Sequence, residues 1–147
     1  VLFPAEFDKI RACRNALNCS VAILKIMRNA INPVFRANEL PEITVRTGLA
    51  YGSALVVLYG KSIEKAHIDI TGSSISLGSK IASIAKPNQV LIGEHIYDII
   101  LSSTNPDDFF DKSKFVQLSL DPLKWKYLSH SDPESLYHVY EYLVIDE

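Results

Sequence analysis

Hydrophobic residues recur every three or four positions along the first part of the chain, which is the spacing of one face of an α-helix. The pattern predicts an amphipathic helix of about seven turns, with Pro4 in its first turn. Asn32–Pro33 is expected to stop or bend this helix, because proline lacks the helical N–H. The apolar positions are Ile10, Cys13, Leu17, Val21, Leu24 and Ile31.

The rest of the chain alternates between short β-branched runs and two further helical patterns. Residues 43–52 and 53–60 are rich in strand-forming residues and punctuated by glycine, which predicts a hairpin. Helices mixed with mostly antiparallel strands predict an α+β sandwich of helices on a sheet. The other expected strands are 65–70, 89–93, 115–120 and 136–146, the expected helices are 73–84 and 94–103, and the longer connections are 105–114 and 121–135.

The predicted helix over residues 73–84 carries two different stripes. Leu77, Ile81 and Ile84 follow core spacing, whereas the second stripe is small and polar and comprises Ser73, Ser76, Lys80 and Ser83. One interpretation is an exposed face with a serine cap at the helix start. The other is a ligand cleft, because small side chains beside free helical N–H groups leave room for a phosphate. In the second interpretation Asp69, Ser76 and Lys80 face the ligand together.

Composition narrows the class of protein. The 147 residues suffice for one domain, and a net charge of −2 gives no indication of nucleic-acid or anionic-membrane binding. No apolar run approaches the ~20 residues that span a bilayer, and the first residues do not resemble a secretion signal. Cys13 and Cys19 are predicted to be unpaired thiols of a reducing compartment, which indicates the cytoplasm. The four histidines have no zinc-binding spacing, so no metal site is expected from this chain.

Two segments resemble the catalytic domain of class III nucleotide cyclases, the adenylate and guanylate cyclase family. Residues 43–60, "ITVRTGLAYGSALVVLYG", are similar to the family's "lrvRiGIhtGpvvaGvvG". Residues 67–100, "HIDITGSSISLGSKIASIAKPNQVLIGEHIYDII", are similar to "ydvwGdtVNlAaRlqslakpgqIlvseetydll". The matching positions are Arg46, Gly48, Gly52, Asp69, Gly72, Ala85, Lys86, Pro87, Gln89, Tyr97 and Asp98, and the resemblance covers roughly residues 1–101.

The resemblance implies a ferredoxin-like α+β domain that dimerises and has its active sites at the dimer interface. Such domains convert ATP or GTP to the cyclic 3′,5′-monophosphate and pyrophosphate, with two Mg²⁺ or Mn²⁺ ions held by two aspartates. By this resemblance Asp69 reads the purine, Ser76 occupies the position of an Asn that orients the ribose, and Lys80 occupies that of an Arg that stabilises the transferring phosphate.

Two of these positions depart from the family pattern. A serine hydroxyl at Ser76 cannot offer the paired donor and acceptor of an amide. Lys80 keeps the positive charge but loses the bidentate fork of arginine. Losing one preorganised donor commonly costs ~10²–10³ in rate. The Lys-Gly pair found near the C-terminus of many family members is replaced here by "LKWKY".

The start of the chain aligns inside the family domain. "VLFP" matches the end of a hairpin, so residues 1–147 are expected to form a single cyclase-homology domain that is N-terminally truncated and lacks the first strands. Both metal-binding aspartates would then precede Val1, and Mg²⁺ or Mn²⁺ would bind only if the parent protein supplies them. The sheet edge left open by the truncation is expected to favour a homodimer or pairing with another cyclase-type domain.

Three functional hypotheses follow. The first is a catalytically degenerate domain that serves in nucleotide sensing or dimerisation and binds a purine nucleotide. The second is a working part of an adenylate or guanylate cyclase. The third is a structural α+β interaction domain without a nucleotide role. Nucleotide binding separates the third from the others, and cyclic product separates the first from the second.

Overall fold

The computed structural model describes residues 1–104 and 110–144. Its helices are α1 (Lys9–Ile26), the π-helical turn η1 (Met27–Ile31), α2 (Asn32–Ala37), α3 (Ser73–Ile84) and α4 (Glu94–Leu101), with short 3-10 turns at Ile63–Lys65 and Lys112–Lys114. Its strands are β1 (Arg46–Leu49), β2 (Leu55–Tyr59), β3 (His67–Thr71), β4 (Gln89–Gly93), β5 (Phe115–Gln117) and β6 (Val139–Tyr142). Residues 105–109, in an expected connection, and 145–147, at the end of the last expected strand, lie outside the described residues.

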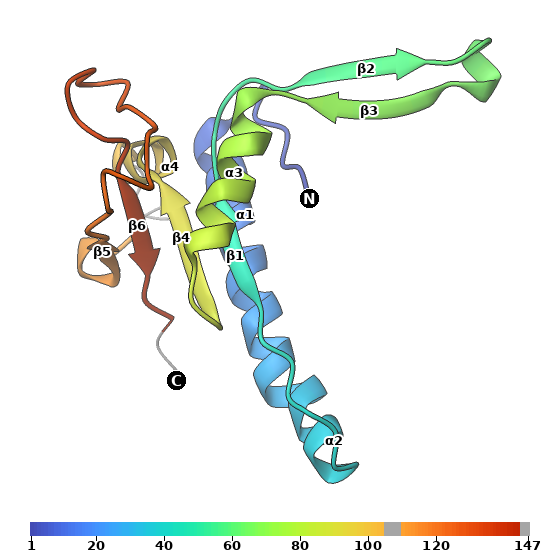
Figure 1. Cartoon of the computed structure of the whole chain (residues 1–147), viewed down its shortest axis with the longest axis vertical. Coiled ribbons are helices and arrows are strands. Elements are labelled where there is room, and N and C mark those ends of the chain that lie inside the picture. The colour runs from blue at the N-terminus through green and yellow to red at the C-terminus, as the bar shows by residue number, and fades with distance from the viewer. Residues whose placement is uncertain (105–109, 145–147) are drawn as a thin grey trace.

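Four strands form one sheet in the order β1-β4-β6-β5, in which β1 and β4 are parallel and the other pairs are antiparallel. The strands β2 and β3 pair antiparallel with each other and project from the body as a two-stranded ribbon, which we call the arm (residues 55–71; Figure 1). The predicted mixture of helices with a mainly antiparallel sheet is confirmed.

The hairpin predicted over residues 43–60 is wrong. Strand β1 pairs with β4, in the register Arg46↔Gln89 to Leu49↔Ile92. The chain leaves the sheet after Leu49, and β2 pairs instead with β3 (Tyr59↔His67). Both predicted strands therefore exist, but each takes a partner that follows later in the chain.

The first helix begins later than predicted. Its N-cap is Asp8, whose carboxylate accepts a hydrogen bond from the backbone N–H of Arg11 (2.8 Å), so Pro4 lies outside the helix. The regular α-helix ends at Ile26, and the π-helical turn η1 leads to Asn32–Pro33, where α2 begins and runs to Ala37, so helical structure does not stop there. The buried amide of Asn32 exchanges two hydrogen bonds with the backbone of Ile43, at 3.0 and 2.8 Å.

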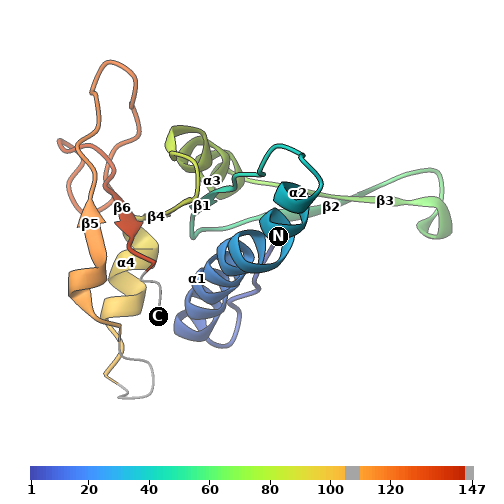
Figure 2. The same cartoon turned by 90° about the horizontal axis from the view of Figure 1, so that it is seen from below.

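Helices cover both faces of the sheet, and β4 is buried on each side. Val90 and Ile92 face the cluster formed with α1 and α4, whereas Leu91 faces the cluster formed with α3 and the segment around Trp125. Figure 2 shows this arrangement, with α3 on one side of β4 and with α1 and α4 on the other. Because side chains alternate along β4, helix α3 with its polar stripe lies on the face of the sheet opposite the long helix α1.

The two cysteines are free thiols, as predicted. Burial raises the pKa of Cys13 to about 11, an effect that nearby Lys9 partly opposes. None of the helices described is both long enough and apolar enough to cross a bilayer.

Candidate functional site

Asp69 lies in the middle of β3, on the arm and in contact with solvent. Its carboxylate accepts a hydrogen bond from the backbone N–H of the next residue, Ile70 (2.8 Å). Val57 of β2 stands directly opposite. The carboxylate is therefore hydrated and available to a ligand or to a second protein surface.

The two faces of the arm differ in chemistry. Residues directly opposite each other in an antiparallel pair share a face, and faces alternate along each strand. One face is wholly aliphatic and consists of Val56, Leu58, Ile68 and Ile70, which we call the aliphatic strip. Ile68 is 70% exposed, and Val56 and Leu58 are 59% and 57% exposed. The opposite face carries Asp69 together with Leu55, Val57, Tyr59, His67 and Thr71.

Both predicted stripes of α3 are present. Leu77 and Ile81 are buried, while Ser76 and Lys80 are exposed one turn apart on the same face. The predicted serine cap is wrong, because the N-cap is Gly72, which makes no side-chain cap. The hydroxyl of Ser74 instead donates to the carbonyl of Ser53 (2.8 Å) and ties the helix start to the base of the arm.

The close packing of α3 on β1 depends on Gly48. A Cβ atom at this position would lie less than 3 Å from backbone atoms of Ala82 and Gly78. At Gly78 the added atom would meet only ordinary contacts, the nearest being Ala50 at 3.6 Å. The backbone of β1 therefore approaches this helix closely, and the approach depends on the glycine of the strand rather than on that of the helix.

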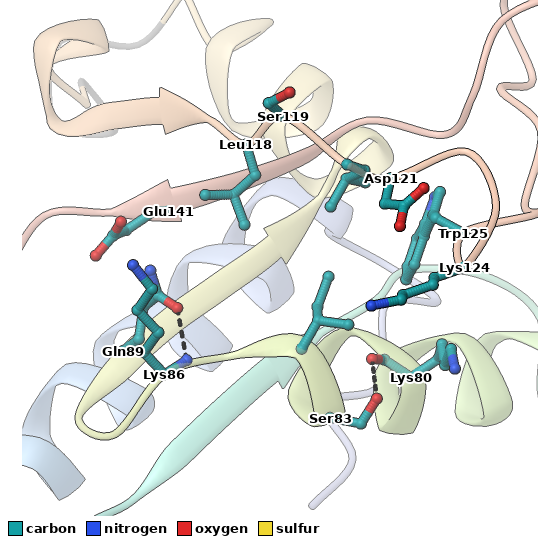
Figure 3. A pocket seen from close by; sticks show the side chains of 12 residues that line it. Lys80, Ser83, Lys86, Gln89, Leu118, Ser119, Asp121, Lys124, Trp125 and Glu141 are labelled. Atoms are coloured by element: carbon teal, nitrogen blue, oxygen red, sulfur yellow. Dashed lines mark hydrogen bonds between the residues drawn. The ribbon is translucent and has the colours of Figure 1, made fainter.

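A cavity of about 580 Å³ opens between the second half of α3 and the segment that follows β5 (Figure 3). Helix α3 contributes Lys80, Ser83 and Ile84, and the sheet contributes Gln89 and Glu141. The remaining lining residues are Lys86, Leu118, Ser119, Leu120, Asp121, Lys124 and Trp125. The volume lies within the ~300–1,000 Å³ range of small-molecule sites.

Three lysines and two carboxylates line this cavity, which gives it a small positive excess. Within the described part of the chain, Lys80, Lys86 and Lys124 form no ion pair with a carboxylate. One oxygen of Asp121 accepts the backbone N–H of Leu123 (2.9 Å), which fixes the turn that carries Lys124. In Figure 3 the ammonium group of Lys124 extends over α3 into the cavity. The cavity thus offers unpaired cations to an anionic group.

The structure brings together only part of the predicted site. Lys80 lines the cavity, whereas Asp69 and Ser76 do not. No hydrogen bond or ion pair among the described residues connects Asp69 with either residue of α3. Sequence reasoning missed Lys86 and Lys124; the basic "LKWKY" segment was a signal for the second, but nothing in its spacing related it to Lys80.

Whether the described residues could bind a divalent cation can be judged from the side chains that would donate to it. Among residues 1–104 and 110–144, no three His, Cys, Asp or Glu side chains gather where they could hold a metal ion. Asp69 is the one carboxylate on β3, and a lone exposed carboxylate is too small a donor set for two divalent cations. The described residues therefore do not fit the family's two-metal site.

No protein-family profile matches the chain. A curated relative, a cytidylate cyclase of Staphylococcus aureus, is 29% identical over 93 residues, which are 62% of this chain and 22% of that protein. The chain thus spans about a fifth of the relative's length.

Three solved structures share the fold. They are the guanylyl cyclase Cya2 (TM-score 0.66, 16% identity, 99% of this chain and 64% of that one), the adenylyl cyclase CyaB from P. aeruginosa (0.62, 17%, 94% and 61%) and the catalytic core of a rhodopsin-guanylyl cyclase with converted specificity in complex with ATPalphaS (0.57, 20%, 90% and 59%). The chain spans about three-fifths of each. The fold is that of a class III nucleotide cyclase catalytic domain, as the sequence resemblance implied.

Proposed function

We propose that this chain, a nucleotide cyclase-type domain by fold, pairs with a second cyclase-type domain through its arm, binds a nucleotide in the pair and has lost most or all catalytic turnover. The observation that carries the proposal is the arm itself, in which a solvent-exposed aliphatic strip stands back to back with Asp69. A second copy of this chain is the simplest partner.

Pairing is supported by the cost of leaving the aliphatic strip in water. Burying an exposed aliphatic side chain of this size contributes about 1.5–3 kcal/mol. Three such residues, Val56, Leu58 and Ile68, lie together on one face of a two-stranded ribbon, and the fourth residue of the strip, Ile70, is half-buried. A ribbon of two strands is marginally stable alone, so a covering domain would also stabilise the arm.

Nucleotide binding is supported by the charges on and beside α3. Lys80 and Lys124 present ammonium groups that attract a phosphate chain, and Ser76 offers a hydroxyl one turn before Lys80. Asp69 would meet the base from the arm, since a carboxylate accepts hydrogen bonds from exocyclic amino and ring N–H groups. We propose a purine as the first candidate base.

Loss of turnover is supported by the residues at the two positions that depart from the family pattern, Ser76 and Lys80, and by the carboxylates available to bind a metal. A hydroxyl at Ser76 and a lysine at Lys80 provide fewer directed donors than an amide and a guanidinium. The described carboxylates do not form a two-metal site, so Mg²⁺ or Mn²⁺ would need ligands from beyond the described residues. We also propose that the protein works in the cytoplasm, in accord with its two free thiols.

An active cyclase is the second candidate function. It is favoured by the curated relative, whose name is cytidylate cyclase and which aligns over 93 residues. This relative makes a pyrimidine nucleotide a further candidate, although the sequence resemblance implied ATP or GTP. The assay should therefore include all four ribonucleoside triphosphates.

The test is to incubate the natural protein with ATP, GTP, CTP or UTP and Mn²⁺, and to measure bound nucleotide and cyclic product in the same samples. The proposal expects saturable binding with product at or near the level of the protein-free blank. Product well above the blank would establish the active cyclase instead. Failure of every nucleotide to bind would leave the structural interaction domain.

A further inference from the structure

Glu94, the first residue of α4, is a buried carboxylate that holds a distant segment of the chain. It is 5% exposed, and one oxygen accepts hydrogen bonds from the hydroxyl of Ser129 (2.9 Å) and the backbone N–H of His130 (3.1 Å). The other oxygen accepts the backbone N–H of His138 (2.8 Å). The backbone N–H of Glu94 in turn donates to the carbonyl of His138 (2.9 Å). Both ends of the segment 129–138 are thus fixed to one side chain.

The same segment is connected to the wall of the cavity. The indole N–H of Trp125 donates to the carbonyl of Tyr137 (3.0 Å), and both side chains are almost fully buried. The hydroxyl of Tyr137 lies 3.4 Å from Nδ1 of His95. Lys124 and Trp125 line the cavity, so the position of this wall depends on the packing of Trp125 with Leu77 and Ile81 of α3 and on how the segment 125–138 is held against α4.

Three imidazoles surround this attachment. The rings of His95 and His130 lie 4.4 Å apart, and Nδ1 of His138 lies 3.6 Å from the carboxylate of Glu94. His95 faces His130, Tyr137, Glu94 and Asp98, so one like charge and two opposite charges act on it when it is protonated. His130 is exposed and lies on the segment, whereas His95 lies on α4. Charging both rings therefore creates a repulsion between the two elements that Glu94 joins.

We propose that Glu94 and the facing pair His95–His130 form an acid-sensitive latch, which holds the segment 125–138 on α4 at neutral pH and releases it when both imidazoles are protonated. Burial and the neighbouring His130 hold the pKa of His95 below its ordinary value of about 6.5, against the opposing effect of Glu94 and Asp98. A protonated His138 would strengthen the contact with Glu94, but its side chain is 40% exposed and the attraction is screened.

Release would move Lys124 and Trp125 away from Lys80. The consequence for ligand binding, weaker nucleotide affinity in acid, rests on the proposed function. The latch itself does not, because it can be read without any nucleotide. Trp125 is the one tryptophan of the 147 residues, so its fluorescence reports this segment specifically.

The experiment follows the Trp125 emission maximum and its quenching by acrylamide in the natural protein between about pH 8 and about pH 5. Far-UV circular dichroism is recorded on the same samples. We expect emission to move to longer wavelength and quenching to increase, with a midpoint below about pH 6.5 and an unchanged dichroism spectrum. A flat emission maximum, or a shift that coincides with loss of secondary structure, would overturn the latch.

Variants separate the latch from general acid effects. His130→Gln removes the facing charge from an exposed position and is expected to move the midpoint to lower pH. Glu94→Gln is expected to show long-wavelength emission already at pH 8. His67→Gln, the same substitution on the arm, is the control and should keep the wild-type midpoint. An unchanged midpoint in His130→Gln would also overturn the latch, whatever the stability of Glu94→Gln.

Discussion

Val57 and Asp69 stand directly opposite each other on the arm, which places the carboxylate of β3 on the face that the aliphatic strip does not occupy. One ribbon therefore presents a wholly aliphatic surface on one side and, on the other, a hydrated acid beside the exposed Leu55 and Tyr59. A partner domain can cover the first without desolvating the second. This separation would let a single short arm serve both the proposed pairing and the proposed ligand contact.

A charge placed in the aliphatic strip should dissociate the pair. Ile68 is 70% exposed within the chain, so Ile68→Lys should change the free energy of unfolding by less than about 0.5 kcal/mol. In the paired state the ammonium group would be buried against an apolar surface, and association should weaken at least about tenfold, or 1.4 kcal/mol. Light scattering across a concentration series measures this change.

Thr71→Lys is the matched control for that experiment. Thr71 lies on the same strand and is exposed, but it belongs to the opposite face of the arm. Its substitution should leave the molar mass unchanged. Equal masses for wild type, Ile68→Lys and Thr71→Lys would contradict the assignment of the aliphatic strip as the pairing surface.

Two glycines of the β1–α3 contact should respond to alanine in opposite directions. Gly48→Ala would place a Cβ against backbone atoms of Ala82 and Gly78 at less than 3 Å, and overpacking of this kind costs about 1–3 kcal/mol. Gly78→Ala meets only ordinary contacts in a helix interior and should stabilise the fold by about 0.5–1 kcal/mol. Urea unfolding of both variants checks the pair; similar effects of the two substitutions would show that α3 does not pack on β1 through Gly48.

Restoring the family residues on α3 should raise cyclase activity if the two substitutions limit it. Ser76→Asn combined with Lys80→Arg returns an amide and a guanidinium fork to the exposed face of the helix. Since each preorganised donor is worth ~10²–10³ in rate, the double variant, made in the parent protein that supplies the residues before Val1, should form cyclic product at least about 10²-fold faster than the same protein without the two substitutions. Chromatography of the product with Mn²⁺ present measures it. No gain over the wild type would mean that other defects dominate.

Alkaline pH should reveal the burial of Cys13. Its pKa rises from an ordinary 9.0 to about 11 in the folded chain, so the unfolded thiol ionises first. The contribution of this thiol to stability is therefore complete below about pH 9 and is lost as the pH rises towards about 11. The difference in unfolding free energy between wild type and Cys13→Ala should shrink across this window. A difference that stays constant with pH would mean that the thiol is not buried as described.

Local sequence patterns predicted an element well where turn-forming residues mark its end. Helix α3 and strand β4 have the predicted bounds because the turn between them is specified by Pro87 and by Asn88, which adopts φ 61°. The hairpin failed for a different reason. Alternation identifies a strand but not its partner, and β1 pairs with a strand that begins forty-three residues later (Arg46↔Gln89). The local sequence also could not show that the amide of Asn32 makes buried hydrogen bonds to Ile43, because these are a tertiary contact.

The site was less predictable than the fold. The stripe of Ser76 and Lys80 follows from helical spacing alone. The cavity does not, because Lys124 and Trp125 reach it from a long connection whose course is set by Glu94, Tyr137 and their hydrogen bonds. Glu94 and Ser129 lie thirty-five residues apart in sequence, Trp125 and Tyr137 lie twelve apart, and no short-range pattern relates either pair.

The most direct test of the account is the nucleotide affinity of Lys80→Ala compared with wild type, measured by isothermal titration calorimetry with the triphosphate that binds best. We expect saturable binding to the wild type, about tenfold weaker binding to Lys80→Ala because a charge-assisted phosphate contact is lost, and wild-type affinity for the arm-tip control Lys65→Ala. Equal affinity of the wild type and Lys80→Ala, or no nucleotide binding at all, would contradict it.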